Sequence, residues 1–179
     1  IDSVFKSRLD SLSKIGMKGL ILDLRNNSGG LLRASLNILD NITDRGKPLL
    51  VKKGKATRFN TDYTSRRIPV IDSEIPIVIL INRKSASASE IVAGTVQDLD
   101  RGILIGQKTF GKGLVQHMWD LNDTMTMKIT TAKYYLPSGR LVQKQDYLDN
   151  GFLTDGLDKS DSIFFKTKNN RDVKGGGGI

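Results

Sequence analysis

Three alternating serines, followed by a glutamate, are the first residues of this chain whose types and spacing could do chemistry. They are Ser85, Ser87, Ser89 and Glu90 in the stretch INRKSASASE, directly after the apolar run IPIVILI. A serine hydroxyl between a strand and a helix can act as a nucleophile, or it can cap the helix. Ser87 and Glu90 have the spacing of a capping box, in which two side chains satisfy two backbone N–H groups. The pattern alone therefore favours the cap.

A catalytic serine also needs a base that takes its proton. The one histidine, His117, lies inside a predicted strand, where a histidine is more often structural, and no carboxylate can be assigned to complete a Ser-His-Asp triad. Lys112 in the stretch TFGKG is the better candidate, because the glycines on both sides let the backbone turn tightly. A lysine acts as a base only when it is neutral, which burial favours. The apolar neighbours that would bury it are Phe110, Leu114 and Val115.

The alternative for Lys112 is a surface lysine in a glycine-rich turn, and the residues alone favour that alternative. Gln116 lies four residues further on. Its amide oxygen could accept a hydrogen bond from the lysine amine if the segment between them twists or carries a bulge. A nucleophile, a base and a group that positions the base are therefore all available in the sequence.

The composition is that of one domain with a core, because 38% of the 179 residues are hydrophobic. No run approaches the roughly 18 apolar residues that a membrane-spanning helix needs, so we do not expect an integral membrane protein. The formal charge of +9 comes from scattered basic residues, and aromatic residues make up only 6%. Proteins that bind single-stranded nucleic acid stack its bases on aromatic side chains beside a basic groove. Because this sequence lacks that combination, we expect no nucleic-acid partner. The absence of cysteine excludes disulfides and cysteine chemistry, and we expect no metal and no cofactor.

Apolar runs alternate with segments of helical spacing, which predicts an α/β domain of repeated strand-turn-helix units. Two joints, DLRNNSGG and INRKSASASE, place small or polar residues at the mouth of a helix, where unpaired backbone N–H groups can receive an anion. We expect residues 57–74 to be an irregular surface segment. We expect the strand at 19–25 to be buried, and residues 129–135 to be buried on both faces. The other predicted elements are helices at residues 1–15, 31–42 and after the serines, and strands at residues 48–56, 77–81, 102–106, 114–121 and 124–135.

Four stretches of the chain resemble the C-terminal processing peptidases, also called tail-specific proteases. In order, they are GLILDLRNNSGG, SASASEIVAGTVQD, GQKTFGKGLVQ and ITTAKYYLPSGRLVQ, which together run from Gly19 to Gln143. Members of this family are serine proteases with a Ser-Lys dyad on a fold related to the crotonase and ClpP class. The resemblance therefore implies a crotonase/ClpP-like α/β core and a protease activity.

The resemblance also implies a role for single residues. Ser87, the middle serine, matches the nucleophile, and Lys112 matches the general base at the family's spacing. Gln116 matches the glutamine that positions the lysine. The oxyanion hole would be built from the backbone N–H groups of Ala88 and Gly29. The outer serines, Ser85 and Ser89, are expected to make local hydrogen bonds.

The domain prediction follows from where the resemblance ends. We expect a catalytic core at residues 1–143, and at residues 144–179 a polar excursion and C-terminal tail that is a truncated part of the same domain. The final GGGGI predicts a flexible tail or the start of a further segment. Because nothing resembles the PDZ domain that family members usually carry, we expect an excised core.

The predicted helix at residues 1–15 has an apolar face, formed by Val4, Phe5, Leu9, Leu12 and Ile15.

The leading functional hypothesis is a serine endopeptidase that cleaves proteins near their C-termini through an acyl-enzyme. Its partners would be proteins or peptides with accessible C-termini, and an oligomer is left open. The family places it in the periplasm or otherwise outside the cytoplasm, with membrane association left open. One alternative is a non-catalytic peptide-binding or scaffolding member, or an inactive excised core. Another is a crotonase-type acyl-CoA enzyme, against which the Ser-Lys spacing argues because that chemistry needs no serine nucleophile.

Overall fold

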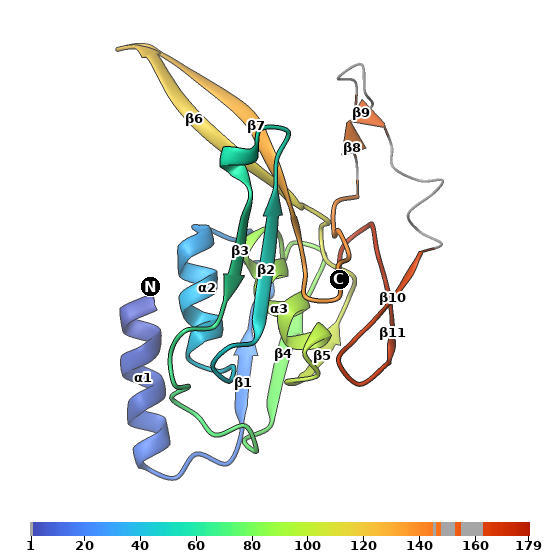
Figure 1. The fold of residues 1–179 in the computed structure, drawn as a ribbon. Helices are drawn as coiled ribbons and strands as arrows, with labels where there is room; N and C mark the ends of the chain where they lie inside the picture. Colours follow the sequence, from blue (N-terminus) through green and yellow to red (C-terminus); the bar gives the residue numbers. More distant parts are fainter. Residues whose placement is uncertain (1, 145, 148–152, 155–162) are drawn as a thin grey trace.

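The computed structural model describes residues 2–144, 146–147, 153–154 and 163–179. Helices and strands are interleaved up to α3, only strands follow it among the described residues, and the α/β class is confirmed (Figure 1). The helices are α1 (Asp2–Lys14), α2 (Leu32–Asp40), the short 3-10 helix η1 (Thr57–Phe59) and α3 (Ala88–Asp98). The strands are β1 (Leu20–Asp23), β2 (Pro48–Lys53), β3 (Thr61–Thr64), β4 (Ile77–Ile81), β5 (Ile103–Gly106), β6 (Leu114–Asn122), β7 (Met125–Tyr135), β8 (Asp146–Tyr147), β9 (Leu153–Thr154), β10 (Phe164–Lys166) and β11 (Asp172–Lys174).

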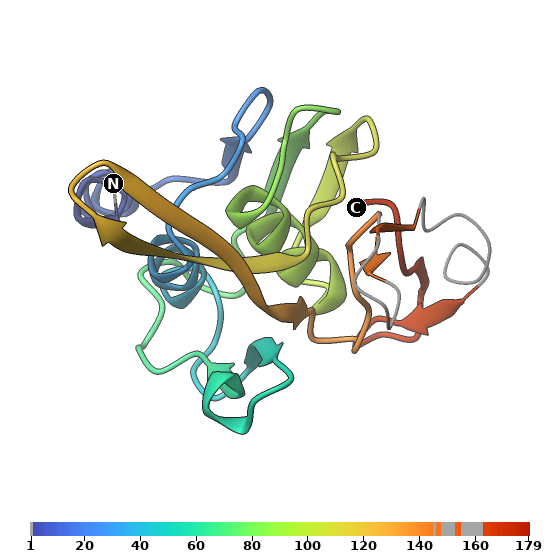
Figure 2. The same ribbon diagram turned by 90° about the horizontal axis from the view of Figure 1, so that it is seen from above.

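Two sheets enclose a layer of helices. Strands β1, β4 and β5 form a parallel sheet in the order β1-β4-β5, and β3, β2, β7 and β6 form an antiparallel sheet in that order. Seen from above, α2 and α3 lie between the parallel sheet and strands β2 and β3 (Figure 2). Parallel strands end on the same side, so the turns after β1 and β4 come together at one edge of their sheet.

Helix α3 is the centre of the core, and all of its residues except Gln97 are buried. A helix that is apolar or small all round is suited to such a position between two sheets. Gly94 allows the close approach, because a Cβ there would lie 2.4 Å from a methyl carbon of Leu136. Toward the same antiparallel sheet, the Thr95 hydroxyl donates to the Leu49 carbonyl of β2 at 2.9 Å. Toward the parallel sheet, Val96 of α3 lies close to Gly102 just before β5, where a Cβ would be 3.1 Å from a methyl carbon of Val96. The helix that begins at the serines is therefore fixed from both sheets.

The β6–β7 hairpin rises out of the body of the molecule and reaches over the side of α1 and α2 (Figures 1 and 2). Because the hairpin leaves the core, the expectation that residues 129–135 are buried on both faces is wrong. Ile129 is 40% exposed, and only Ala132 and Tyr134 in this stretch are buried. The pairing of β6 with β7 shifts register between Val115 and Gln116, which marks a β-bulge at the root of the hairpin.

Three further expectations about burial and regularity need correction. Helix α1 packs through a narrow face, since Leu9 is buried whereas Val4 is 62% and Leu12 is 41% exposed. Strand β1 is covered on one face only, and Ile21 on its other face is 70% exposed. Residues 57–74 are not wholly irregular, because they contain η1 and the edge strand β3, which pairs with β2.

The last residues, GGGGI, are bound to the core, so the expectation of a flexible tail is wrong for them. The N–H groups of Gly176 and Gly178 donate to the carbonyls of Leu141 and Val142 at 2.7 and 2.9 Å. Gly178 has a φ of +96°, and a Cβ there would lie 2.5 Å from the Thr109 carbonyl oxygen. The glycines therefore serve a close approach of two backbone segments rather than flexibility.

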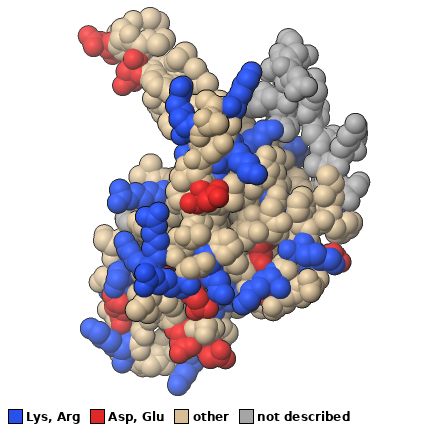
Figure 3. Space-filling view, viewed as in Figure 1, with Lys and Arg blue, Asp and Glu red and all other residues tan. Residues whose placement is uncertain are grey.

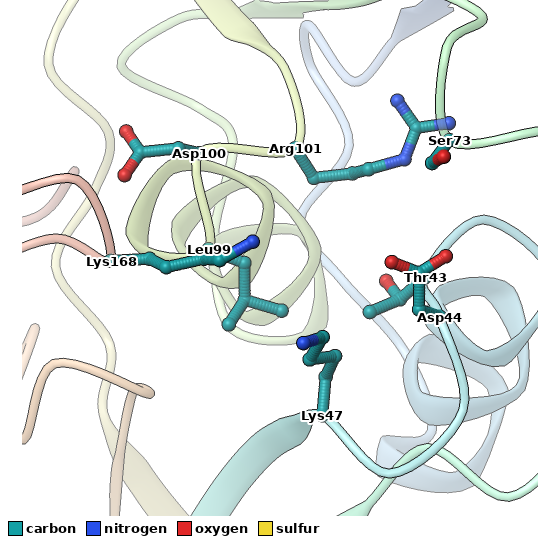
Figure 4. A pocket seen from close by; sticks show the side chains of 8 residues that line it. All are labelled: Thr43, Asp44, Lys47, Ser73, Leu99, Asp100, Arg101 and Lys168. Carbon is teal, nitrogen blue, oxygen red and sulfur yellow. The ribbon is translucent and has the colours of Figure 1, made fainter.

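The C-terminal ends of α2 and α3 meet at a small pocket, which Arg101 lines together with Lys47 and Lys168 (Figure 4). The guanidinium of Arg101 donates to the carbonyls of Ile42, Ile75 and Asp72 at 2.7, 2.8 and 3.0 Å. Helix C-termini leave carbonyl groups unpaired and carry a partial negative charge, so a cation is the matching partner. Arg101 thereby joins the end of α2 to the segment that precedes β4.

A buried ion pair holds the end of α3 to the segment that follows β7. Arg140 lies 2.7 Å from an Asp98 carboxylate oxygen, and the two side chains are 3% and 0% exposed. Arg140 also donates to the Gln97 side chain and to the carbonyl of Lys174 in β11. The other Asp98 oxygen accepts from the backbone N–H of Ser138. The pair therefore connects three segments at one buried point.

We predict that Arg140→Met lowers the free energy of unfolding by about 3–5 kcal/mol, because it leaves the Asp98 charge buried without its partner. The control is Lys6→Met, which breaks the exposed pair with Asp10 on α1 and should cost less than about 1 kcal/mol. Urea denaturation of both variants measures the difference. Equal stability of the two variants would contradict the role given to this ion pair.

Candidate active site

The turn between β4 and α3 presents Ser87 to a pocket. Ser87 is the residue before α3 begins and has a φ of +54° and a ψ of −113°, a conformation that costs a non-glycine residue about 1–3 kcal/mol. Its side chain is half-buried and lines a pocket of about 280 Å³. The other residues that line it are Gly30, Leu31, Leu32, Ala88, Ile91, Lys112, Leu114, Val115, Gln116, Lys128 and Tyr134. The pocket thus brings together Ser87, Ala88, Lys112 and Gln116 from separate parts of the sequence.

The two outer serines are structural, as the sequence analysis expects. Ser85 is fully buried, and its hydroxyl donates to the Leu24 carbonyl at 2.7 Å. The buried Ser89 hydroxyl donates to the Asn27 carbonyl at 3.0 Å. Both bonds connect the serine turn to the turn after β1. The alternation therefore leaves only the middle serine facing the pocket.

A single carboxylate connects the serine turn with the lysine turn. One oxygen of Glu90 accepts from the backbone N–H groups of Ser87 and Lys112, each at 2.8 Å. The other accepts from the Thr109 hydroxyl and from the Gly111 N–H, each at 2.6 Å. Burial raises the pKa of Glu90, and these four donors oppose the rise because they stabilise the charged form. Glu90 is 0% exposed, so this connection lies inside the core.

Lys112 owes its position to this connection and not to the apolar neighbour that the sequence suggests. Phe110 is 60% exposed and does not line the pocket with Lys112. Leu114 and Val115 do line the pocket with Lys112. The hydroxyl of Tyr134 donates to the carbonyl of Lys112, so both the N–H and the carbonyl of the lysine are held.

The backbone N–H groups of Ala88 and Gly29, which the resemblance implies as oxyanion donors, are not equally free. The N–H of Ala88 has no hydrogen-bond acceptor in the described part of the chain, as expected of the first residue of a helix. Gly29 has a φ of +100°, and a Cβ there would lie 2.8 Å from the Ala88 nitrogen. Its N–H donates to the side-chain oxygen of Asn27 at 2.9 Å. The N–H of Gly30, which lines the pocket, meets no acceptor among the described residues.

Gln116 and His117 lie on opposite faces of β6. The bulge turns Gln116 into the pocket, where its amide nitrogen lies 3.4 Å from the Thr130 hydroxyl. The side chain of Gln116 therefore contacts β7, and its predicted role in holding the lysine amine stays a prediction. His117 lies 2.7 Å from the Thr131 hydroxyl and packs beside the rings of Phe59 and Trp119. The histidine does not line the pocket.

Sequence reasoning missed two features of this site. Tyr134 is 2% exposed and lines the pocket, and burial followed by the charge of Glu90 raises the pKa of its hydroxyl. The tyrosine occupies a buried position in the alternating stretch ITTAKYY, which is the only sequence signal for it. Glu90 was expected to cap a helix, and no local pattern indicates that its carboxylate also holds the lysine turn.

The described residues show neither a metal-binding cluster nor a membrane-spanning helix. They contain no group of three His, Cys, Asp or Glu side chains placed to hold a metal ion. None of their helices has the length and apolar character to cross a membrane.

Several known proteins are similar to this chain. A chloroplastic C-terminal processing peptidase of Tetradesmus obliquus is 43% identical over 135 residues, which are 74% of this chain and 28% of that protein. A carboxyl-terminal-processing protease of Picosynechococcus sp. is 42% identical over 129 residues, which are 72% of this chain and 30% of that protein. A solved structure titled photosystem II D1 C-terminal processing protease superposes with a TM-score of 0.70 at 38% identity, over 79% of this chain and 36% of that one.

These similarities define a class of processing peptidases. The model of the family described as "Peptidase family S41" matches residues 1–152 of this chain. The chain belongs to peptidase family S41, and the resemblance to C-terminal processing peptidases is confirmed. The chain spans less than a third of the length of the two curated relatives.

We predict that Glu90→Gln lowers the free energy of unfolding by about 2–4 kcal/mol, because the amide NH₂ faces hydrogen-bond donors and leaves them unpaired. The serine and lysine turns lose their common anchor, so the reaction of Ser87 with a fluorophosphonate should slow by about tenfold or more. The control is Glu74→Gln, since Glu74 is the only other glutamate and is exposed. Thermal unfolding and labelling rates of both variants test this. Wild-type stability of Glu90→Gln would show that the carboxylate is not needed.

Proposed function

We propose that this chain carries the active site of a serine endopeptidase that cleaves proteins near their C-termini through an acyl-enzyme. Ser87 is the nucleophile and Lys112 the general base. The observation that carries the proposal is that these two residues, far apart in sequence, line one pocket and have their backbones held by one carboxylate. The relatives named as C-terminal processing proteases support the choice of substrate.

The reaction follows from these positions. The neutral amine of Lys112 takes the hydroxyl proton of Ser87, and the serine oxygen attacks the peptide carbonyl. The resulting oxyanion accepts from the N–H of Ala88 and from an N–H of the Gly29–Gly30 pair, at the start of α3. The ammonium of Lys112 then gives its proton to the departing amine. Water, activated by the same lysine, hydrolyses the acyl ester and frees Ser87.

Gln116 is proposed to position the lysine amine from the bulge of β6. Because Gln116 shares the pocket with Lys112, a rotation of its side chain away from Thr130 would suffice. The bacterial and chloroplastic origin of the relatives supports a location outside the cytoplasm, the periplasm in a bacterium. Proteins with accessible C-termini are the proposed partners.

We predict that Ser87→Ala abolishes covalent labelling by a fluorophosphonate, whereas Ser85→Ala and Ser89→Ala retain it. The reason is that only Ser87 faces the pocket, while the outer hydroxyls donate to backbone carbonyls. The outer variants should lose about 1 kcal/mol of stability each. Mass mapping of the labelled peptide is the measurement. Labelling that survives Ser87→Ala but disappears in a neighbour would refute the assignment, and unlabelled wild-type protein would favour the non-catalytic alternative.

We predict that the rate of fluorophosphonate inactivation rises with pH, since only the neutral lysine can take the serine proton. Lys112→Arg should be inactive although it keeps the charge, because arginine does not deprotonate in proteins. His117→Gln should react like wild type, because the histidine lies outside the pocket. The second-order rate against pH for the three proteins is the test. An active Lys112→Arg together with an inactive His117→Gln would replace the dyad with a histidine-based site.

A further inference from the structure

A groove lies along α2, beside the pocket that Ser87 lines. Its volume is about 600 Å³, and Leu32 lines both the groove and the catalytic pocket. Leu32, Leu36 and Asp40 recur every four residues and mark the face of α2 that the groove follows. Leu49 and Tyr63 of the antiparallel sheet add apolar surface opposite the helix. The groove thus leads away from Ser87 between α2 and β3.

Three arginines line this groove. Arg33 lies on α2, and Arg66 and Arg67 lie in the segment after β3. In the described part of the chain, none of the three guanidinium groups takes part in a hydrogen bond or ion pair. Basic side chains gather over this part of the surface, where Figure 1 places α2 and β3 (Figure 3).

One carboxylate also lines the groove. Asp40 is 9% exposed and accepts a hydrogen bond from the backbone N–H of Arg66 at 2.7 Å. This carboxylate holds the Arg66–Arg67 segment against the end of α2 and leaves both guanidinium groups free. Three positive charges therefore face one negative charge, which gives the groove a net positive charge beside its apolar side chains.

We propose that the groove binds a segment of the substrate in which acidic side chains alternate with apolar ones. This inference rests on the proposed peptidase function, because it places the segment next to the bond that Ser87 attacks. From Leu32 to Asp40 the helix rises about 12 Å, which matches about four residues of an extended peptide. Alternate side chains of such a peptide point to opposite sides, so apolar ones can face the leucines while acidic ones face the arginines.

The acidic groups of the occupant are side chains rather than a single terminal carboxylate. The three guanidinium groups come from two elements, and each can bind one carboxylate through two parallel hydrogen bonds. A single C-terminal carboxylate would leave two of the three unpaired in the groove. Several Asp or Glu side chains, spaced along the segment, use all three.

Binding of a labelled peptide tests the proposal without requiring cleavage. The probe is a fluorescein-labelled peptide of alternating Leu and Glu with an amidated C-terminus, compared with the same peptide carrying Gln for Glu. Fluorescence anisotropy at low salt should show about tenfold tighter binding of the Glu peptide to the full chain. Arg66→Gln/Arg67→Gln should lose most of this preference. The matched control Lys18→Gln/Lys168→Gln, which removes the same charge outside the groove, should keep it.

Three results would overturn the proposal. They are equal binding of the Glu and Gln peptides by wild-type protein, unchanged binding of the Glu peptide by the arginine variant, and an equal loss in the lysine control. Fluorophosphonate labelling of Ser87, measured on the same proteins, should be unchanged in the arginine variant. If wild-type protein binds the Glu peptide but is not labelled, the peptidase proposal fails while the groove assignment stands.

Discussion

The buried carboxylate of Glu90 is the interaction on which the candidate site depends. It accepts four hydrogen bonds, from the serine turn and from the segment that carries the lysine. Bonds to a charged group contribute about 1.5–3 kcal/mol each, which compensates for taking a carboxylate out of water. A charge buried in this way tolerates little displacement, because any donor that moves away leaves it unpaired. The distance between the two turns is therefore set by one side chain.

This constraint explains the small residues around the serine. The turn after β1 must approach the serine turn closely, and Gly29 permits it because a Cβ there would meet the backbone of residues 86 and 88. The hydroxyls of Ser85 and Ser89 then fasten the two turns together. With its neighbours fixed on both sides, Ser87 can be held at a positive φ that an isolated turn would relax. Ser87 lines the pocket, and the N–H of Ala88, the first of α3, meets no acceptor among the described residues.

The sequence was informative where local chemistry decides the structure. Patterns a few residues long predict the strands that end at the two polar joints and the helix after the serines. They also favour a structural role for Ser85, Ser89 and His117. Periodicity could not show that β1 has an exposed face or that the β6–β7 hairpin leaves the core, because burial depends on which elements pack together. The role of Glu90 was hidden for the same reason, since its second set of donors comes from Thr109, Gly111 and Lys112. The glycines at the C-terminal end indicated flexibility, whereas here they allow two backbones to pair.

The arrangement divides rigid from adaptable parts of the molecule. Glu90 belongs to α3 and Ser87 directly precedes it. Because both sheets enclose this helix, the proposed nucleophile has little freedom to move. Lys112 precedes the β6–β7 hairpin, which projects from the body of the molecule. The bulge between Val115 and Gln116 turns the glutamine toward the pocket, whereas His117 lies on the other face of β6. The arginines that line the groove lie on the N-terminal turn of α2 and on a surface segment, where side chains can change without disturbing α3. The residues proposed for bond cleavage are thus confined by the core, whereas those proposed to select the substrate lie where the core places no constraint on them.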